Sequence, residues 1–214
     1  MQQQLRAAFS RWGMPRCLRV DNGKPWGSWN DLPPVLALWL IGLGIDVLWN
    51  DPCRPQQNGV VERSQGTGKR WAEPHTCRSL AELQGRLDAD DCLQRERYPL
   101  AHGRSRWELF PALAHSGRPY RAAEEARHWR LQRVREHLAE YAVPRQVDCQ
   151  GKISVYNRNL YVGVMHRGQQ GWVQFDPEQG QWLISDNAGR QLRTQPAAEI
   201  SAAAICSLQL AGRK

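Results

Sequence analysis

Apolar residues recur at helical and then at strand spacing along the first third of the chain. Residues 2–12 place their apolar side chains on one face, which predicts a helix. Residues 17–20 and 45–49 are short apolar runs bounded by turn residues, which predicts two strands. Between them, Asp31 is a predicted N-cap before two prolines and an apolar helix, and another helix is expected to begin near Val60. This alternation predicts an α/β layer with a partly parallel sheet.

Helical spacing continues through the middle of the chain. It predicts a helix over residues 79–98, a short one over 108–114 and one long amphipathic helix over 121–141. Residues 95–145 contain eleven arginines and six glutamates, a difference of +5. Such a segment is either a solvated helix face or a surface that contacts DNA, and the pattern alone leaves both interpretations open.

The pattern changes to short strands after Pro144. Turn clusters rich in Asp, Asn, Pro and Gly separate five runs of strand type. The runs are residues 152–156, 158–164, 172–175, 182–185 and 190–194. Five short strands in so little sequence predict a small all-β barrel of the SH3-like type over residues 146–196, followed by a flexible tail over 197–214.

Composition adds an expected partner and an expected environment. The 214 residues carry 29 Lys and Arg against 21 Asp and Glu, a net charge of +8, which favours anionic partners. Arginine dominates the positive charge, which suits phosphate recognition but also follows from a GC-rich genome. The six cysteines form no CxxC pair, so no zinc site is expected and a reducing cytoplasm fits best. Prolines, glycines and an aspartate interrupt the most apolar stretch, residues 32–47, so no membrane span is expected.

Two acids stand at the ends of predicted elements. Asp21 follows the strand over residues 17–20, and Glu62 lies in the first turn of the helix after a loop rich in Pro, Gln and Asn. Carboxylates that converge at a sheet edge are suited to Mg²⁺ or Mn²⁺, and two such ions can support phosphoryl transfer. Alternatively, Asp21 caps a turn and Glu62 complements a helix N-terminus.

The residues around these acids form a recognisable pattern. Residues 20–23 read Val-Asp-Asn-Gly and residues 55–63 read Pro-Gln-Gln-Asn-Gly-Val-Val-Glu-Arg. Together they resemble the catalytic core of DDE transposases and retroviral integrases, in particular that of bacterial insertion-sequence transposases. The resemblance implies that Asp21 and Glu62 are the second and third catalytic acids, that they bind two Mg²⁺ or Mn²⁺ ions, and that the core has an RNase H-like fold.

The resemblance also implies contacts with DNA. Asn58 and Gly59 would shape a mobile loop, while Arg63, Lys69 and Arg70 on the following helix would contact DNA ends. The strand-rich segment is similar to the Mu-type β-barrel that follows the core in many transposases. Family members act as DNA-bridged multimers, so the expected partners are transposon ends, target DNA, and further copies or a full-length transposase, at the nucleoid.

Two departures from the family pattern matter. None of the twenty residues before Asp21 is Asp or Glu, so the first catalytic acid is missing. An N-terminal truncation and a misplaced start or split frame explain this equally well, and the chain is expected to be poorly active alone. In addition, a Tyr-Asn…Arg-Pro-His segment that is common after the core is reduced here to residues 97–99 and His102.

The sequence therefore predicts a partial RNase H-like core over residues 1–75, a helical connector over 76–145 and the barrel. The expected function is metal-dependent DNA strand cleavage and strand transfer. The leading alternative is a non-catalytic DNA-binding or assembly module, and an RNase H-like nuclease is a third interpretation. Lesser candidates are two tryptophans and two histidines. The tryptophans either stack on a base or pack in the core, and the histidines either contact phosphate or, as is usual for isolated histidines, have a structural role. These are Trp26, Trp29, His75 and His115.

Overall fold

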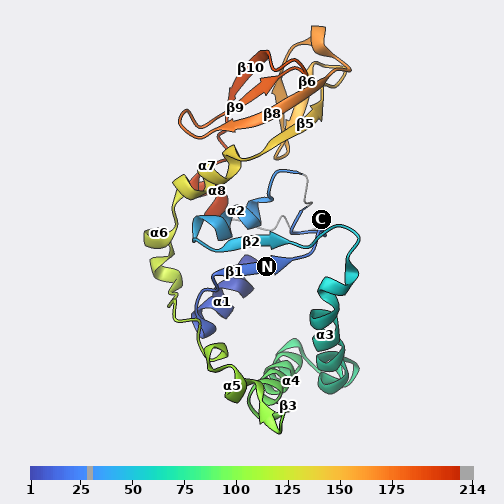
Figure 1. Ribbon diagram of the computed structural model, residues 1–214, viewed down its shortest axis with the longest axis vertical. Coiled ribbons are helices and arrows are strands. Elements are labelled where there is room, and N and C mark those ends of the chain that lie inside the picture. The colour runs from blue at the N-terminus through green and yellow to red at the C-terminus, as the bar shows by residue number, and fades with distance from the viewer. Residues whose placement is uncertain (28–30, 208–214) are drawn as a thin grey trace. The chain divides into compact units, whose positions relative to one another are not determined.

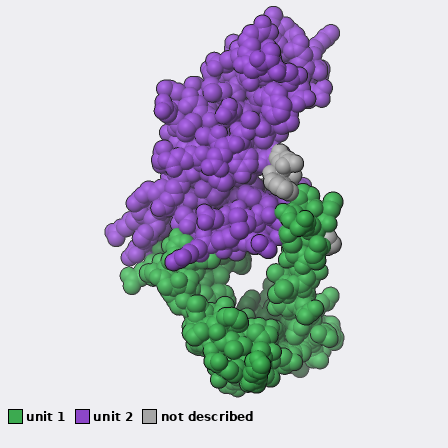
Figure 2. Space-filling view, in the orientation of Figure 1, with its two compact units in different colours: residues 1, 3–15, 51–122 green, residues 2, 16–50, 123–214 purple. Residues whose placement is uncertain are grey.

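The computed structural model describes residues 1–27 and 31–207. The chain forms two compact units (Figure 2). Unit 1 contains residues 1, 3–15 and 51–122, and unit 2 contains residue 2, residues 16–50 and the residues from 123 onwards. This division differs from the predicted boundaries, because residues 16–50 belong with the strand-rich segment rather than with residues 51–75.

Unit 2 begins with the predicted strand, helix and strand. Strand β1 (Cys17–Val20) pairs in parallel with β2 (Asp46–Trp49), and helix α2 (Val35–Gly42) lies between them in the chain (Figure 1). The sequence of α2 is apolar all round, and the helix is accordingly buried from Leu36 to Gly42. The parallel pairing is confirmed, and within the described residues this sheet has two strands.

The predicted N-cap of α2 is wrong. Pro34 occupies the N-cap position, and Asp31 lies too far upstream to cap the helix. The carboxylate of Asp31 instead accepts the backbone N–H of Leu32 at 2.7 Å and forms an ion pair with Arg145. Because Arg145 lies 114 residues away, only the folded chain brings these two side chains together.

The predicted long helix over residues 121–141 is also wrong. The chain forms three short pieces there: a 3₁₀ turn η5 (Ala122–Glu124), α6 (Glu125–His128) and α7 (Leu131–Ala139). The break falls at Trp129, whose backbone is extended and whose side chain is buried. Its indole packs against Gly42 of α2, so burial of this ring offsets the helical hydrogen bonds lost at the break.

The strand-rich segment forms an open sheet. Strands β10, β9, β8 and β5 pair in that order as a four-stranded antiparallel sheet, and β6 pairs with β7 as a separate hairpin. The bounds are β5 (Ala142–Gln146), β6 (Lys152–Val155), β7 (Arg158–Tyr161), the 3₁₀ turn η6 (Val164–His166), β8 (Gln170–Asp176), β9 (Gln181–Ser185) and β10 (Gln191–Pro196). All five predicted strands are confirmed, but the closed barrel is not: in the described residues β6 and β7 form ladders only with each other.

The sheet and the end of the chain share the core of unit 2. Alternate residues of β8 and β9 are buried, among them Phe175 and Trp182, whose rings meet edge to face. The predicted flexible tail is corrected for its first part, since Ser201 caps a short helix, α8 (Ala202–Cys206). Ile205 of α8 is fully buried and the helix contacts α2, which explains why it is ordered. The last seven residues of that tail lie outside the described residues.

Unit 1 is mainly helical. Helix α1 (Gln2–Trp12) has the predicted bounds, and α4 starts after a Ser79 cap, then passes into a π-helical turn before residue 98. A capping box at Ser105 starts the next short helix earlier than predicted. The remaining bounds are η1 (Pro55–Asn58), α3 (Gly59–Ala72), η2 (Pro74–Thr76), α4 (Leu80–Cys92), η3 (Leu93–Arg97), β3 (Pro99–Ala101), β4 (Arg104–Ser105), α5 (Arg106–Leu109) and η4 (Pro111–Leu113).

Within residues 1–27 and 31–207, none of the helices combines the length and the apolar composition that a membrane span requires.

Candidate functional site

Asp21 lies directly after β1, in a turn that links the ends of the two parallel strands. Its side chain is exposed, and its Oδ1 accepts the backbone N–H of Gly23 at 3.2 Å. The neighbouring Asn22 donates from Nδ2 to the backbone carbonyl of Asn50 at 2.8 Å. Asn50 follows β2, so this bond ties the carboxyl ends of both strands together. The Asp-Asn-Gly turn therefore presents a carboxylate at the sheet edge, while also serving the turn-capping role that the sequence left open.

The loop before α3 is shaped by a reciprocal contact. The side-chain carbonyl of Gln57 accepts the backbone N–H of Asp51 at 2.9 Å, and its amide donates to Asp51 Oδ2 at 3.0 Å. Arg54 pairs with the same carboxylate oxygen at 3.3 Å. These contacts fix the path of the chain into α3, where Glu62 is exposed in the first turn. A carboxylate in that turn also complements the helix dipole.

The predicted DNA-contacting residues share one helix and its start. Asn58 is the N-cap of α3 and makes no side-chain capping bond there. A Cβ at Gly59 would meet nothing within 4 Å, so packing in unit 1 does not require glycine at this position. Arg63, Lys69 and Arg70 are exposed, and their charged groups have no hydrogen bond or ion pair with another described residue. Their positive charge is available to an anionic partner.

The two candidate metal-binding acids belong to different compact units, Asp21 to unit 2 and Glu62 to unit 1. Two carboxylates supply the oxygen donors that Mg²⁺ and Mn²⁺ prefer. In the described part of the chain, however, no three His, Cys, Asp or Glu side chains are grouped so that they could hold a metal ion. Among its described residues, neither unit therefore contains a group of three such side chains.

A pocket that sequence reasoning missed lies in unit 1, between α3 and the segment from α4 to α5. It has a volume of about 880 Å³, within the range typical of ligand sites. Its lining includes four arginines, one acid and two aromatic rings. These are Arg63, Arg70, Arg95, Arg106, Asp91, Trp71 and Tyr98. The signal available in the sequence was the basic stretch that ends in Trp71, but the residues opposite it come from a segment about thirty positions later.

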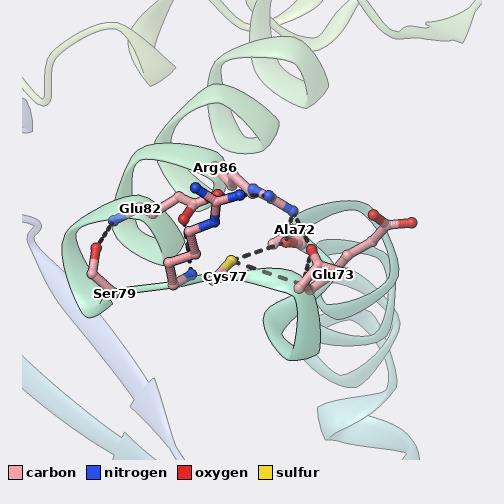
Figure 3. A network of polar contacts seen from close by, with 8 residues as sticks. Ala72, Glu73, Cys77, Ser79, Glu82 and Arg86 are labelled. Atoms are coloured by element: carbon pink, nitrogen blue, oxygen red, sulfur yellow. Dashed lines mark hydrogen bonds and ion pairs between the residues drawn. The ribbon is translucent and has the colours of Figure 1, made fainter.

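The turn between α3 and α4 holds the two helices of this pocket in place (Figure 3). Arg86 of α4 donates to the carbonyl of Ala72 at 3.2 Å, to Thr76 Oγ1 at 2.7 Å and to Glu82 Oε1 at 2.7 Å. The other oxygen of Glu82 accepts the backbone N–H of Arg78 at 2.8 Å. The bond from the Arg78 backbone and the bond from Arg86 lower the pKa of Glu82, since both stabilise its charged form.

The arginine-rich segment over residues 95–145 is used mostly within the fold. Arg106 donates to the carbonyl of Gln94 at 2.8 Å, Arg118 to that of Pro15 at 2.7 Å, and Arg133 to that of Gly42 at 3.1 Å. Arg95, Arg104, Arg130, Arg135 and Arg145 likewise bond to backbone carbonyls. These contacts favour the structural interpretation of the segment over a general DNA-binding face.

The remaining candidates show ordinary structural roles or none. The carbonyl of Trp26 accepts the indole N–H of Trp49 at 2.8 Å, and the Trp26 ring is half-buried, which favours packing. Trp29 lies outside the described residues. His75 is exposed in η2, and Nδ1 of His115 accepts the backbone N–H of Gly117 at 3.1 Å.

No protein-family model matches the sequence.

Proposed function

We propose that this chain is part of a DDE transposase that cleaves and joins DNA strands with the help of divalent metal ions. The observation that carries the proposal is the placement of its two motif acids. Asp21 follows a strand that has a parallel partner, and Glu62 is exposed in the first turn of the helix after the Pro-Gln-Gln-Asn-Gly loop. Both carboxylates are accessible to solvent, so protein atoms do not cover either of them against a divalent ion.

The proposed roles follow from chemistry and position. Asp21 and Glu62 would hold Mg²⁺ or Mn²⁺, which supplies charge stabilisation in phosphoryl transfer. A third carboxylate has to come from outside residues 1–20, because these contain no Asp or Glu. Gln57 fixes the loop that leads to Glu62, and the exposed cations of α3 would contact the DNA backbone. Arginine suits the phosphate because its planar fork can make two parallel hydrogen bonds.

A nicking and strand-transfer assay with Mn²⁺ tests the proposal. Asp21→Asn and Glu62→Gln remove one metal-binding charge each at nearly constant shape, so each should reduce product formation by at least about a hundredfold. Asp46→Asn, an exposed acid in β2, and Glu73→Gln, at the other end of α3, are matched controls and should retain wild-type activity. Measurable activity that is equal in the motif variants and their controls would contradict the assignment of these acids.

A non-catalytic DNA-binding or assembly module is the second candidate function, and one observation favours it. The described residues hold no group of three metal-binding side chains, whereas the cations of α3 are exposed and unpaired. A chain of this kind would bind duplex DNA with a steep salt dependence and show no Mn²⁺-dependent product. The same assay bears on both candidates: Mn²⁺-dependent product that is lost in Glu62→Gln excludes the module, and binding without cleavage under every metal condition favours the module or a transposase that lacks its first acid.

A further inference from the structure

The pocket between α3 and the segment from α4 to α5 differs from a general basic surface in its combination of groups. Four arginines and one aspartate line it, which leaves a net charge of +3 by subtraction. Trp71 and Tyr98 line it as well, with ring centroids 5.8 Å apart and ring planes inclined by 56°. Both rings are large, apolar and substantially exposed, 42% for Trp71 and 50% for Tyr98, so they are available to a ligand.

Among the described residues, two of the four arginines have hydrogen-bond partners for their guanidinium groups and two have none. Arg95 donates to the carbonyl of Leu113 at 2.9 Å and lies 3.6 Å from Asp91, and Arg106 donates to the carbonyl of Gln94 at 2.8 Å. By contrast, Arg63 and Arg70 have no partner for their guanidinium groups among the described residues. They stand seven residues apart on α3, two helical turns, and therefore project from a similar face.

Trp71 is the next residue after Arg70, so α3 brings a stacking ring beside an unpaired guanidinium group. Bases stack on aromatic side chains whatever their sequence, and arginine forks bind phosphate oxygens. An acidic peptide would use the cations but would leave both rings without a planar partner. The combination therefore matches an unpaired nucleotide better than any other common anion.

We propose that this pocket binds an unpaired nucleotide of a DNA strand, with the base stacked on Trp71 beside Tyr98 and the backbone phosphates on Arg63 and Arg70. The proposal rests on the function proposed above and deepens it. Strand cleavage and joining by this chain would then require local unpairing of DNA beside α3. The binding is sequence-tolerant, because stacking and phosphate contacts read no base edge.

The test is the affinity of the full chain for a labelled oligothymidylate, measured by fluorescence anisotropy beside a duplex of mixed sequence. Trp71→Leu should weaken oligothymidylate binding by about tenfold or more, while Trp71→Tyr, which keeps an aromatic face, should restore most of it. Trp107→Leu is the matched control, because Trp107 is 40% exposed in the same unit and does not line the pocket. Thermal unfolding of each variant shows whether it is folded.

A second pair of variants tests the phosphate contacts at equal loss of charge. Arg63→Gln with Arg70→Gln should weaken strand binding by about tenfold, and Arg78→Gln with Arg97→Gln, which lie outside the pocket, by much less. Competition by thymidine monophosphate as strong as that by the oligonucleotide would indicate a site for free nucleotides, and equal competition by polyglutamate would indicate a site for any anion. Either result overturns the assignment to a DNA strand.

The outcomes also separate this inference from the proposed function. Unchanged strand affinity of Trp71→Leu, together with duplex binding and Mn²⁺-dependent nicking, overturns the pocket assignment and leaves the proposed function standing. If the wild-type chain binds neither strand nor duplex, both proposals fail.

Discussion

The indole N–H of Trp129 donates a hydrogen bond of 3.1 Å to the backbone carbonyl of Trp39. The same indole lies against Gly42, so closely that a Cβ on Gly42 would stand 2.1 Å from Nε1. The backbone carbonyl of Gly42 in turn accepts the N–H of Arg130 at 2.9 Å. This contact fixes where the predicted long helix breaks, and it docks α7 on α2.

The close approach of Trp129 and Gly42 predicts a large effect of a small substitution. Gly42→Ala adds one methyl group where the ring already lies, so it should destabilise the protein by about 1–3 kcal/mol or more. Trp129→Ala should cost about 3–5 kcal/mol, because it leaves a cavity against α2. Denaturant unfolding measures the loss in free energy of unfolding for both variants. Trp107→Ala, at a half-exposed ring, is the control and should cost clearly less; equal losses at the two tryptophans would refute the docking role of Trp129.

The paired bonds between Asp51 and Gln57 predict a local effect of charge. Gln57→Glu places a second carboxylate against Asp51 and removes the amide donor, so the loop before α3 should open more often. Hydrogen exchange at the Asp51 amide should become about tenfold faster, since that N–H is donated to the Gln57 side chain. The adjacent Gln56→Glu introduces the same charge at an exposed position. If both variants exchange alike, the contact does not hold the loop.

The bonds to Glu82 predict a pH dependence of stability. Because the pKa of Glu82 is lowered in the folded chain, its contribution to stability is fully present above the pKa of the unfolded chain and is lost as the pH falls through the pKa of the folded chain. Glu82→Gln should therefore lower the Tm near neutral pH, and the difference from the wild type should shrink in acid. In an Arg86→Met background the effect of Glu82→Gln should be smaller yet still present, because the bond from the Arg78 backbone remains. A Tm difference that is independent of pH would contradict this account.

The glycines of α3 offer a matched pair for testing helix stability. A Cβ at Gly66 would meet nothing within 4 Å, so Gly66→Ala should stabilise the protein by about 0.5–1 kcal/mol through helix propensity. A Cβ at Gly68 would lie 3.1 Å from Asp90 Oδ2, so Gly68→Ala should gain less or destabilise. The order of the two Tm values checks the packing of α3 on α4. A higher Tm for Gly68→Ala than for Gly66→Ala would show that this packing is looser than the structure indicates.

Local spacing was sufficient for most of the individual elements. Helix α1, strand β1 and the start of α3 near Val60 follow from apolar periods and turn residues that act within a few positions of each other. The five strands after Pro144 were predicted for the same reason. The motif acids were also evident, because Asp21 and Glu62 are recognised by their immediate neighbours in the sequence.

Contacts between distant residues decided the rest. Residues 121–141 have a continuous helical period, and burial of the Trp129 ring against Gly42, far away in the sequence, favours the break. The strand-rich segment forms an open sheet and not the predicted closed barrel. Strand pairing depends on which strand edges meet in the folded chain, and the sequence of a single strand does not determine this. The pocket beside Trp71 arises in the same way, since α3 and the segment from α4 to α5 supply opposite sides of it. The sequence by itself thus determined most of the elements and pointed to the candidate acids. The tertiary structure decided which side chains meet and where the long helix breaks, because packing depends on long-range contacts that local periods do not encode.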